Sequence, residues 1–431
     1  MPRVNGGTDE GWSYPFMMQS HGSGKIDSCK SGLRRLCMRP FIAGLIIVTI
    51  LAGGQSAAEP PSFAPAGKVI RVGPRHALTT VAAAARLAKD GDVVEIEAGD
   101  YIDDVASWPQ SNLTIRAVGG RARMVSRGNS AEGKAIWVIK GHIVIVENVE
   151  FYGARVPARN GAGIRHEGGK LIIRNCLFEH NEMGLLTWNS ASAELEIERS
   201  EFRHNAVAQT YKPGDRIGHQ IYVGTIGRFL IRESYVHHGA FGHLVKSRAR
   251  ENYIYNNRFT DEHDGRASYE LEFPNGGIAY VVGNIIQQSA HTENWTLVSF
   301  GAEGYKWPRN ELYLVNNTLV DDLPTKGAIL TVVPGADRIE AANNLILGNS
   351  RLETVAVGDY VANYSAVEEE TIGDRRDYRL RRTSELIGKA ADRGEAAGVA
   401  LAPEREYVHP LQSKPIIGVP RNPGAIQSVA H

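Results

Sequence analysis

The stretch RNCLFEHN at positions 174–181 decides the fold, because its pattern recurs along the chain. Each copy is a short β-favouring run with one large apolar residue, here called the anchor, in its fifth position. The copies are ENVEFYG (147–153), RNCLFEHN (174–181), ERSEFRHN (198–205), RESYVHHG (232–239), YNNRFTDE (255–262), VGNIIQQS (282–289), VNNTLVDD (315–322) and ANNLILGN (342–349). The anchors are Phe151, Phe178, Phe202, Val236, Phe259, Ile286, Leu319 and Ile346. A sequence pattern that recurs every 23 to 34 residues is typical of solenoid proteins.

The steps between anchors fit the coils of a parallel β-helix. They are 27, 24, 34, 23, 27, 33 and 27 residues long, which suits one coil of three short strands and their turns, with loops inserted in the longer coils. Stacked asparagine amides could satisfy turn backbone groups in such a column, and asparagines lie two residues before four anchors: Asn257, Asn284, Asn317 and Asn344. A leucine-rich repeat would need an L-x-x-L-x-L pattern, which is missing here, and a propeller would need about 40 residues per blade. Neither alternative fits the chain. We therefore predict an all-β, right-handed parallel β-helix.

The two ends of the repeat region also have distinct sequences. Thr79 or Thr80 could cap a short helix over VAAAARLAK (81–89), whose apolar face would cover the first coil. The strand DVVEIEAGDY (92–101) would then open the β-helix. We expect one domain over residues 59–431, with coils over about 68–366 and a C-terminal capping segment over 367–431.

The first 58 residues are typical of a disordered start followed by a signal peptide. Arg34, Arg35 and Arg39 precede an apolar run at 41–51, and the small residues 56–58 suit a signal peptidase. The run is short for a membrane span, which takes about 20 residues, although an uncleaved anchor is the alternative. Cys29 and Cys37 fall in this segment and leave Cys176 alone in the mature chain, so an internal disulfide is not expected. We expect an exported protein, periplasmic or secreted.

Composition limits the possible partners. The 48 Lys and Arg residues balance the 48 Asp and Glu residues, so no global field attracts nucleic acid. No glycine-rich phosphate loop follows a strand and opens a helix, so a nucleotide is not expected either. Any acidic partner must be bound by a local cluster, and we expect a monomer.

The chain resembles the pectin-lyase-like superfamily of right-handed parallel β-helix proteins over residues 68–427. The opening HALTTVAAAARLAKDGDVVEIEAGDY (76–101) is similar to that superfamily's entry segment. The closing DYRLRRTSELIGKA (377–390), followed by RNPGAIQ (421–427), is similar to its terminator. One fold hosts many unrelated sites, so the resemblance implies the fold more strongly than any activity.

Candidate chemistry concentrates between Gly218 and Gly304. Successive coils advance by about 4.8 Å, so residues far apart in sequence would stack into one patch. The paired phrases GHQIYV (218–223) and GHLVKS (242–247) indicate that His219 and His243 occupy equivalent positions on adjacent coils. Glu270 and Glu272 share one side of the strand YELEF (269–273), and we expect them in an outward groove, since burying two carboxylates is costly.

Lys246-Ser247 is followed by Asn252-Tyr253 and by NNRF (256–259). This stretch resembles the Lys-Ser and then Asn-rich pattern of alginate and chondroitin lyases on this fold. That resemblance implies that Lys246 is the base in β-elimination of an acidic, uronate-containing polysaccharide and that Arg266 assists as acid. It also implies that Glu270 and Glu272 bind Ca²⁺. The positive charges of Arg248 and Arg266 nearby could lower the pKa of Lys246, which would favour the neutral lysine that a base requires. The alternative is a solvated lysine on an exposed strand, which would contribute little to folding.

The remaining candidates would contact substrate. His219 and His243 could donate protons or contact sugar, or could be turn histidines that bond the backbone. Candidate substrate-binding residues are Arg248, Tyr222, Tyr269, Trp188 and Trp307. The column formed by His180, His204 and His238 is better explained by stacked turn residues than by a metal. A glycoside hydrolase using Asp261 with Asp264, or Glu270 with Glu272, and a non-catalytic glycan-binding protein remain alternatives.

Overall fold

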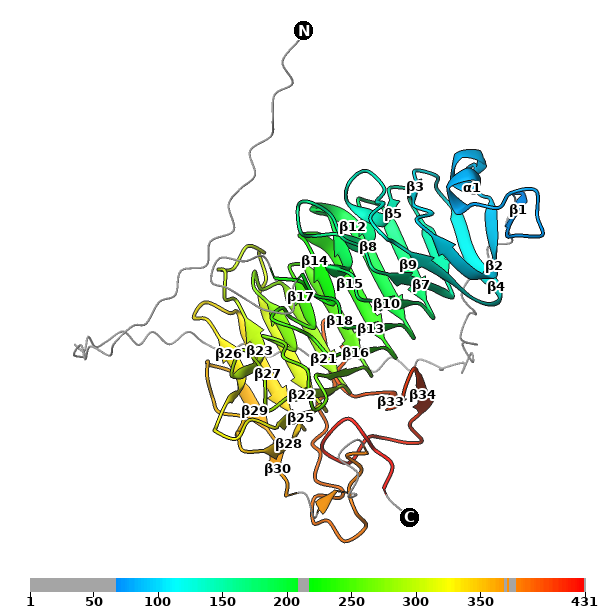
Figure 1. Ribbon diagram of the computed structural model, residues 1–431. Coiled ribbons are helices and arrows are strands. Elements are labelled where there is room, and N and C mark those ends of the chain that lie inside the picture. The colour runs from blue at the N-terminus through cyan, green and yellow to red at the C-terminus, as the bar shows by residue number, and fades with distance from the viewer. Residues whose placement is uncertain (1–66, 208–216, 368–369, 372–376, 430–431) are drawn as a thin grey trace, which may run out of the picture. The chain divides into compact units, whose positions relative to one another are not determined.

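The computed structural model describes residues 67–207, 217–367, 370–371 and 377–429. The predicted signal peptide lies outside the described residues. Short parallel strands stack coil upon coil in three columns, as predicted for a parallel β-helix (Figure 1). Two columns belong to one large sheet, here sheet A, and the third forms a separate sheet, here sheet B.

The first column of sheet A contains β1 (Val69–Val72), β2 (Val93–Ile102), β4 (Leu113–Val125), β6 (Val144–Glu147), β9 (Lys170–Arg174), β12 (Ser190–Glu198), β15 (Ile226–Arg232), β18 (Glu251–Tyr255), β21 (Ile278–Val282), β24 (Glu311–Val315), β27 (Arg338–Ala342) and β29 (Asp359–Val361). Its second column contains the later parts of β2 and β4, then β7 (Val149–Tyr152), β10 (Leu177–Glu179), β13 (Glu201–Arg203), β16 (Tyr235–His237), β19 (Arg258–Thr260), β22 (Ile285–Gln288), β25 (Thr318–Asp321), β28 (Leu345–Gly348) and β30 (Tyr364–Ser365).

Sheet B contains β3 (Ala106–Trp108), β5 (Ala135–Ile139), β8 (Ala162–His166), β11 (Met183–Thr187), β14 (Ile221–Val223), β17 (Val245–Ser247), β20 (Leu271–Phe273), β23 (Thr296–Phe300) and β26 (Ala328–Val332). Each coil therefore passes through one strand of sheet B and then through both columns of sheet A.

The anchors form one internal column, as the repeat predicts. Phe151, Phe178 and Phe202 pair in register on β7, β10 and β13, and their rings stack with centroids 4.9 and 4.4 Å apart. The register continues without a break to Ile346 on β28. All eight anchors are buried, so the column is the spine of the hydrophobic core.

The asparagine column is confirmed as a hydrogen-bonded ladder. The Asn257 amide donates to Asn284 Oδ1 at 3.0 Å, and Asn284 donates to Asn317 Oδ1 at 3.1 Å. Asn317 and Asn344 continue the ladder in the same way. The histidine column is likewise a stack of turn residues: His180, His204 and His238 all have positive φ angles, and neighbouring rings lie 5.3 and 4.8 Å apart.

The predicted helix covers the first coil. Helix α1 spans Val81–Leu87, and the side chain of its N-cap residue Thr80 accepts from the amide of Ala83 at 3.3 Å. Val81, Ala84 and Ala85 are buried against the β-helix. Among the described residues, no helix is both long and apolar enough to cross a membrane.

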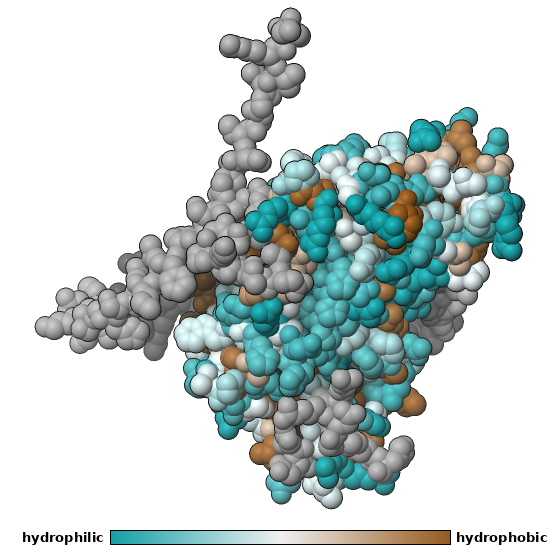
Figure 2. All heavy atoms as spheres, in the orientation of Figure 1, coloured by the Kyte–Doolittle hydropathy of each residue, from teal (hydrophilic) through white to brown (hydrophobic). Residues whose placement is uncertain are grey.

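The C-terminal segment covers the side of the β-helix. Its short strands are β31 (Glu395–Ala396), β32 (Val399–Ala400), β33 (Arg405–Val408) and β34 (Gln412–Pro415). Tyr378, Tyr407 and Ile426 pack on outward-facing residues of β22, β25 and β28 in sheet A, beside which the segment runs in Figure 1. Hydrophilic side chains form a broad band across the face drawn in Figure 2. The described C-terminal residues pack on sheet A, which directs attention to the outer side of sheet B.

Candidate functional site

The outer side of sheet B carries a column of polar residues. Strand register places Tyr222 on β14 beside Lys246 on β17, and Lys246 beside Glu272 on β20. Their neighbours Ile221, Val245 and Leu271 point inward and are buried in the core. The period-2 alternation of a strand thus sends one side chain of each pair into the core and the next into the site. His219 and His243 occupy equivalent positions on adjacent coils, as predicted, with ring centroids 4.7 Å apart.

Lys246 lies between two carboxylates. Its Nζ is 2.8 Å from Glu272 Oε2 and 2.9 Å from Glu303 Oε1. The lysine is 0% exposed, so the expectation of an exposed strand lysine is wrong. The loop after β23 explains the difference, because the Glu303 amide donates to Pro274 O at 2.8 Å and Trp307 Nε1 donates to Arg248 O at 3.0 Å. These bonds fold the loop over β17 and β20.

Arg248 holds the Glu303 carboxylate in a fork. Its Nη2 lies 2.7 Å from both Glu303 oxygens, and its Nε lies 3.2 Å from Oε2. Arg248 Nη1 also donates to the hydroxyl of Tyr222. Burial opposes ionisation of Glu303, but Lys246 and Arg248 outweigh that effect and lower its pKa. A carboxylate bound by two cations is the central electrostatic feature of this site.

The pKa values of the two histidines beside this pair are lowered, which favours their neutral forms. Burial lowers the pKa of His219 well below its usual range, and the neighbouring His243 and Lys246 act in the same direction. Burial also lowers the pKa of His243, whose Nε2 lies 2.9 Å from Glu272 Oε2. Burial would raise the pKa of Glu272, but His243 and Lys246 bring it down to about 2. The cluster thus holds two cations, Lys246 and Arg248, against two anions, Glu272 and Glu303.

Glu270 lies apart from this cluster and has a different environment. It is 0% exposed, and neither carboxyl oxygen has a hydrogen-bond partner. Burial, reinforced by Asp261, raises its pKa well above the usual range, which favours the protonated, neutral form of Glu270. The expectation that Glu270 and Glu272 lie in an outward groove is wrong, because flanking loops and coils enclose both.

These two residues do not fit the expected calcium site. Calcium takes six to eight oxygen ligands, including charged carboxylates. Glu272 is already paired with Lys246, and burial favours the protonated form of Glu270. Among the residues that the structure describes, no group of three His, Cys, Asp or Glu side chains could hold a metal ion.

Replacing Glu270 by glutamine should change how stability depends on pH. The folded-state pKa of Glu270 is raised above the ordinary value of 4.5, so the folded protein keeps a proton that the unfolded chain releases as pH rises. The wild type should therefore lose up to about 1.4 kcal/mol of unfolding free energy per pH unit above pH 4.5 through this group. Glu270→Gln removes that loss, and its advantage over wild type should grow between pH 5 and pH 8.

Urea unfolding at a series of pH values measures this effect. The exposed Glu385 provides a control, and Glu385→Gln should follow the wild-type curve. Parallel curves for wild type and Glu270→Gln would show that Glu270 is ionised in the folded state.

The other predicted residues divide between the cluster and its surroundings. Tyr269 packs its ring against His243, with centroids 4.9 Å apart. Trp307 joins the site by fastening the loop to Arg248, whereas the Arg266 guanidinium stacks over Phe241 at 4.5 Å. Trp188 is 56% exposed at the end of β11.

The carboxylates proposed for a hydrolase do not form an exposed pair. Asp261 is 0% exposed and accepts from the amides of Gly239 and Ala267, whereas the Asp264 side chain is 74% exposed and lies 3.2 Å from His238. Burial raises the pKa of Asp261 to about 7.

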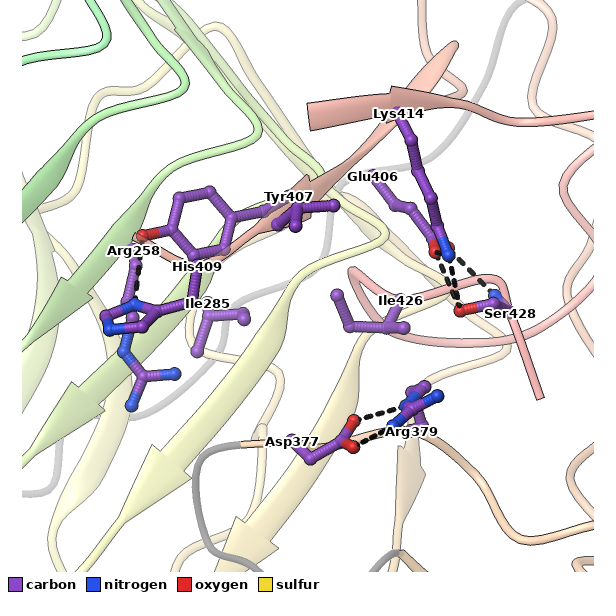
Figure 3. Close-up of a pocket in the computed structure, with 11 residues that line it drawn as sticks. Arg258, Ile285, Asp377, Arg379, Glu406, Tyr407, His409, Lys414, Ile426 and Ser428 are labelled. Carbon is purple, nitrogen blue, oxygen red and sulfur yellow. Dashed lines mark hydrogen bonds and ion pairs between the residues drawn. The ribbon is translucent and has the colours of Figure 1, made fainter. Parts of the chain in front are cut away.

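A hollow lies between sheet A and the C-terminal segment (Figure 3). It has a volume of about 350 Å³. Four of its charged side chains pair within the lining, since Asp377 bonds Arg379 and Glu406 bonds Lys414, with Ser428 also bonded to Glu406. Arg258 pairs instead with Glu262. The contacts of Asp377 and Glu406 lie within the C-terminal segment, which is bound to the β-helix elsewhere, where Ser413 Oγ donates to Glu233 Oε1 at 2.7 Å.

Comparison with known proteins extends the argument on fold. No protein-family model and no curated protein sequence matches the chain. The chain is similar in structure to the pectate lyase Pel9A, with a TM-score of 0.54 and 13% identity over 84% of this chain and 96% of that one. The two chains share a fold. At this identity the likeness concerns the backbone alone, and it agrees with the parallel β-helix.

Two other solved structures are more distant. An alginate lyase in complex with a trisaccharide has a TM-score of 0.35 and 14% identity over 70% of this chain and 79% of that one. A pectin methylesterase from Aspergillus niger has a TM-score of 0.31 and 11% identity over 78% of this chain and 94% of that one.

One residue on sheet B and one on a neighbouring loop were not predicted from the sequence. Glu303 stands in the phrase SFGAEG (299–304), but nothing in that phrase indicates that the loop returns to β17. Arg165 occupies the same outward column as Tyr222, two coils earlier. The alternation in the strand AGIRH (162–166) could have placed Arg165 outside the core.

Proposed function

We propose that the protein is an exported polysaccharide lyase that cleaves an acidic, uronate-containing polysaccharide by β-elimination. One observation carries the proposal: Lys246 and Arg248 together bind the carboxylate of Glu303, which belongs to a surface loop and has a side chain that is 24% exposed. A uronate carboxylate has the same charge and shape, so it could replace Glu303 on these two cations.

Elimination from a uronate has three requirements. The carboxylate must be neutralised, the C5 proton must be removed, and the leaving oxygen at C4 must gain a proton. With the substrate carboxylate on Arg248, C5 would lie one bond away, near the Tyr222 hydroxyl that the same guanidinium contacts. A guanidinium that donates to a phenol oxygen favours the phenolate form.

We assign proton abstraction to Tyr222. Its phenolate would take the C5 proton, the electron pair of the C5–H bond would form the C4–C5 double bond, and the C4–O bond would break with its electron pair leaving on the oxygen. The leaving oxygen would then take its proton from the newly formed Tyr222 hydroxyl or from water. Lys246 stays the alternative base, but two carboxylates within 3 Å favour its charged ammonium form. Its better role is to neutralise the substrate carboxylate.

The comparison and the N-terminal sequence are consistent with this function. The pectate lyase of similar fold is named for a uronate polymer, although one fold can host many activities. The apolar run after Arg34, Arg35 and Arg39 supports export. Mass spectrometry of the exported fraction from the native host should find a chain that starts near Glu59.

An activity screen tests the function directly. Purified protein is incubated with polygalacturonate, alginate and chondroitin, each with and without a chelator. Elimination leaves an unsaturated sugar that absorbs ultraviolet light, whereas hydrolysis leaves none. Reducing ends without this absorbance would indicate a glycoside hydrolase, and binding without turnover would indicate a glycan-binding protein. Loss of activity with the chelator would show that a metal takes part.

Replacing Glu303 by glutamine should strengthen substrate binding. The neutral amide would no longer compete for Lys246 and Arg248, and the cluster would gain one net positive charge. We expect the KM for the cleaved polyuronate to fall about 3- to 10-fold, which corresponds to one weakened charge-assisted hydrogen bond. Glu353 pairs with Lys326 on the surface, so Glu353→Gln serves as a matched control with no change expected. A Glu303→Gln enzyme with an unchanged KM would contradict substrate binding at this cation pair.

A further inference from the structure

Arg165 is a buried cation with incomplete pairing. It lies on β8, is 9% exposed, and has an Nε atom with no hydrogen-bond partner. The nearest carboxylate oxygen to that atom, Glu167 Oε1, is 3.9 Å away, which is beyond hydrogen-bond distance. Buried polar groups are nearly always hydrogen-bonded, so this exception calls for an explanation.

The carboxylates near Arg165 are already paired with lysines. Glu167 Oε1 lies 2.7 Å from Lys134 Nζ, and Glu132 Oε1 lies 2.6 Å from Lys140 Nζ. The two lysines and two glutamates balance, which leaves the guanidinium as the excess positive charge. Burial also lowers the pKa of Arg165, because its neighbours compensate the charge only weakly. The positive charge of Arg165 is therefore balanced only weakly by its neighbours.

Trp188 lies directly against this cation. The Arg165 guanidinium sits 5.1 Å from the centre of the Trp188 ring, while the tryptophan is 56% exposed. The Trp188 backbone amide donates to His166 O at 2.7 Å, which fixes the position of the residue at the end of β11. An exposed aromatic face beside a buried cation is suited to a sugar ring that carries a carboxylate.

Strand register relates this pair to the site around Lys246. Arg165 pairs with Leu186, Leu186 with Tyr222, and Tyr222 with Lys246. Three coil steps of about 4.8 Å separate Arg165 from Lys246 along the outer side of sheet B. A polysaccharide that follows the axis of the β-helix would cross both places.

We propose that Arg165 and Trp188 form a distal subsite that binds a uronate unit a few sugars away from the cleaved bond. The subsite rests on the proposed function, because it assumes that the polymer also binds at Lys246 and Arg248. Arg165 would pair with the uronate carboxylate, and Trp188 would stack on the ring. It would increase affinity for long chains and select acidic over esterified units.

Binding and cleavage by Arg165→Gln and Trp188→Ala test the subsite. Calorimetry with a hexauronate of the sugar found in the screen should show a Kd raised about 10- to 100-fold for Arg165→Gln and about 3- to 10-fold for Trp188→Ala. The KM for the polymer should rise by similar factors, whereas the KM for the shortest oligomer that wild type cleaves should not change. Arg165→Gln should also lose the wild-type preference for the acid over its methyl ester.

The controls separate this proposal from the proposed function. Trp295 is 68% exposed at the start of β23, and Trp295→Ala should bind as wild type does. Circular dichroism should confirm folding of both variants, and Trp188→Ala provides a second variant that keeps the Arg165 charge in place. Weaker hexauronate binding by both variants, in a wild type that binds without cleaving, would support the subsite while refuting the lyase. Unchanged binding by both variants, or a wild type that binds no hexauronate, would overturn the subsite.

Discussion

Replacing Tyr222 by phenylalanine is expected to reduce kcat for elimination by about 10² to 10⁴, the usual range for loss of a general base. The substitution removes the hydroxyl that Arg248 contacts and leaves the ring in place. Arg248 keeps its fork to Glu303, so the variant should fold and bind substrate nearly as wild type does. The loss should therefore appear in kcat rather than in KM.

Tyr269 provides the matched control for that experiment. It is also half-buried, and its ring packs against His243 within the same cluster. Tyr269→Phe should keep most of the activity, because no step is assigned to its hydroxyl. The initial rate of ultraviolet absorbance at saturating polyuronate measures kcat for all three proteins. A Tyr222→Phe enzyme that keeps more than a tenth of wild-type kcat would return Lys246 to consideration as the base.

The fold could be predicted because its determinants repeat. One anchor per coil and the asparagines in step with it fix the register of every coil, and the structure places Phe178 and Phe259 in the same buried column. A repeated pattern gives several independent observations of one structural rule. The N-cap could be narrowed to Thr79 or Thr80, and the structure has Thr80, since a helix N-cap depends on a few neighbouring residues.

The site could be predicted only in part. Strand alternation brought Tyr222, Lys246 and Glu272 together on adjacent coils. Burial of Lys246 depends on the loop that carries Glu303, and a loop conformation that occurs once leaves no periodic signal.

The same strand alternation led to a wrong prediction for Glu270, which was expected to line an outward groove and is buried. It shares a strand side with Glu272, yet Glu272 pairs with Lys246, whereas the carboxyl oxygens of Glu270 have no hydrogen-bond partner and its charged neighbours are Asp261 and Asp321. The surroundings of a strand side chain are determined by the residues of adjacent coils and of the turns between strands.

Replacing Lys246 by alanine is expected to lower the free energy of unfolding by about 3 to 5 kcal/mol, the usual result of removing one partner from a buried ion pair. The reason lies in the charge balance of the cluster. Lys246 and Arg248 offset Glu272 and Glu303, and loss of the lysine leaves one buried carboxylate uncompensated. An exposed lysine would give a much smaller effect.

Two further variants separate charge balance from loss of packing. Lys246→Met with Glu272→Gln removes one charge of each sign and leaves Arg248 paired with Glu303, so it should recover much of the lost stability. Lys326 is 58% exposed and pairs with Glu353 on the surface, so Lys326→Ala should cost less than about 1 kcal/mol. Urea unfolding at pH 7 measures all three. If Lys246→Ala unfolds no more easily than Lys326→Ala, the lysine does not compensate a buried carboxylate. If the double variant is as unstable as Lys246→Ala, packing rather than charge determines the loss.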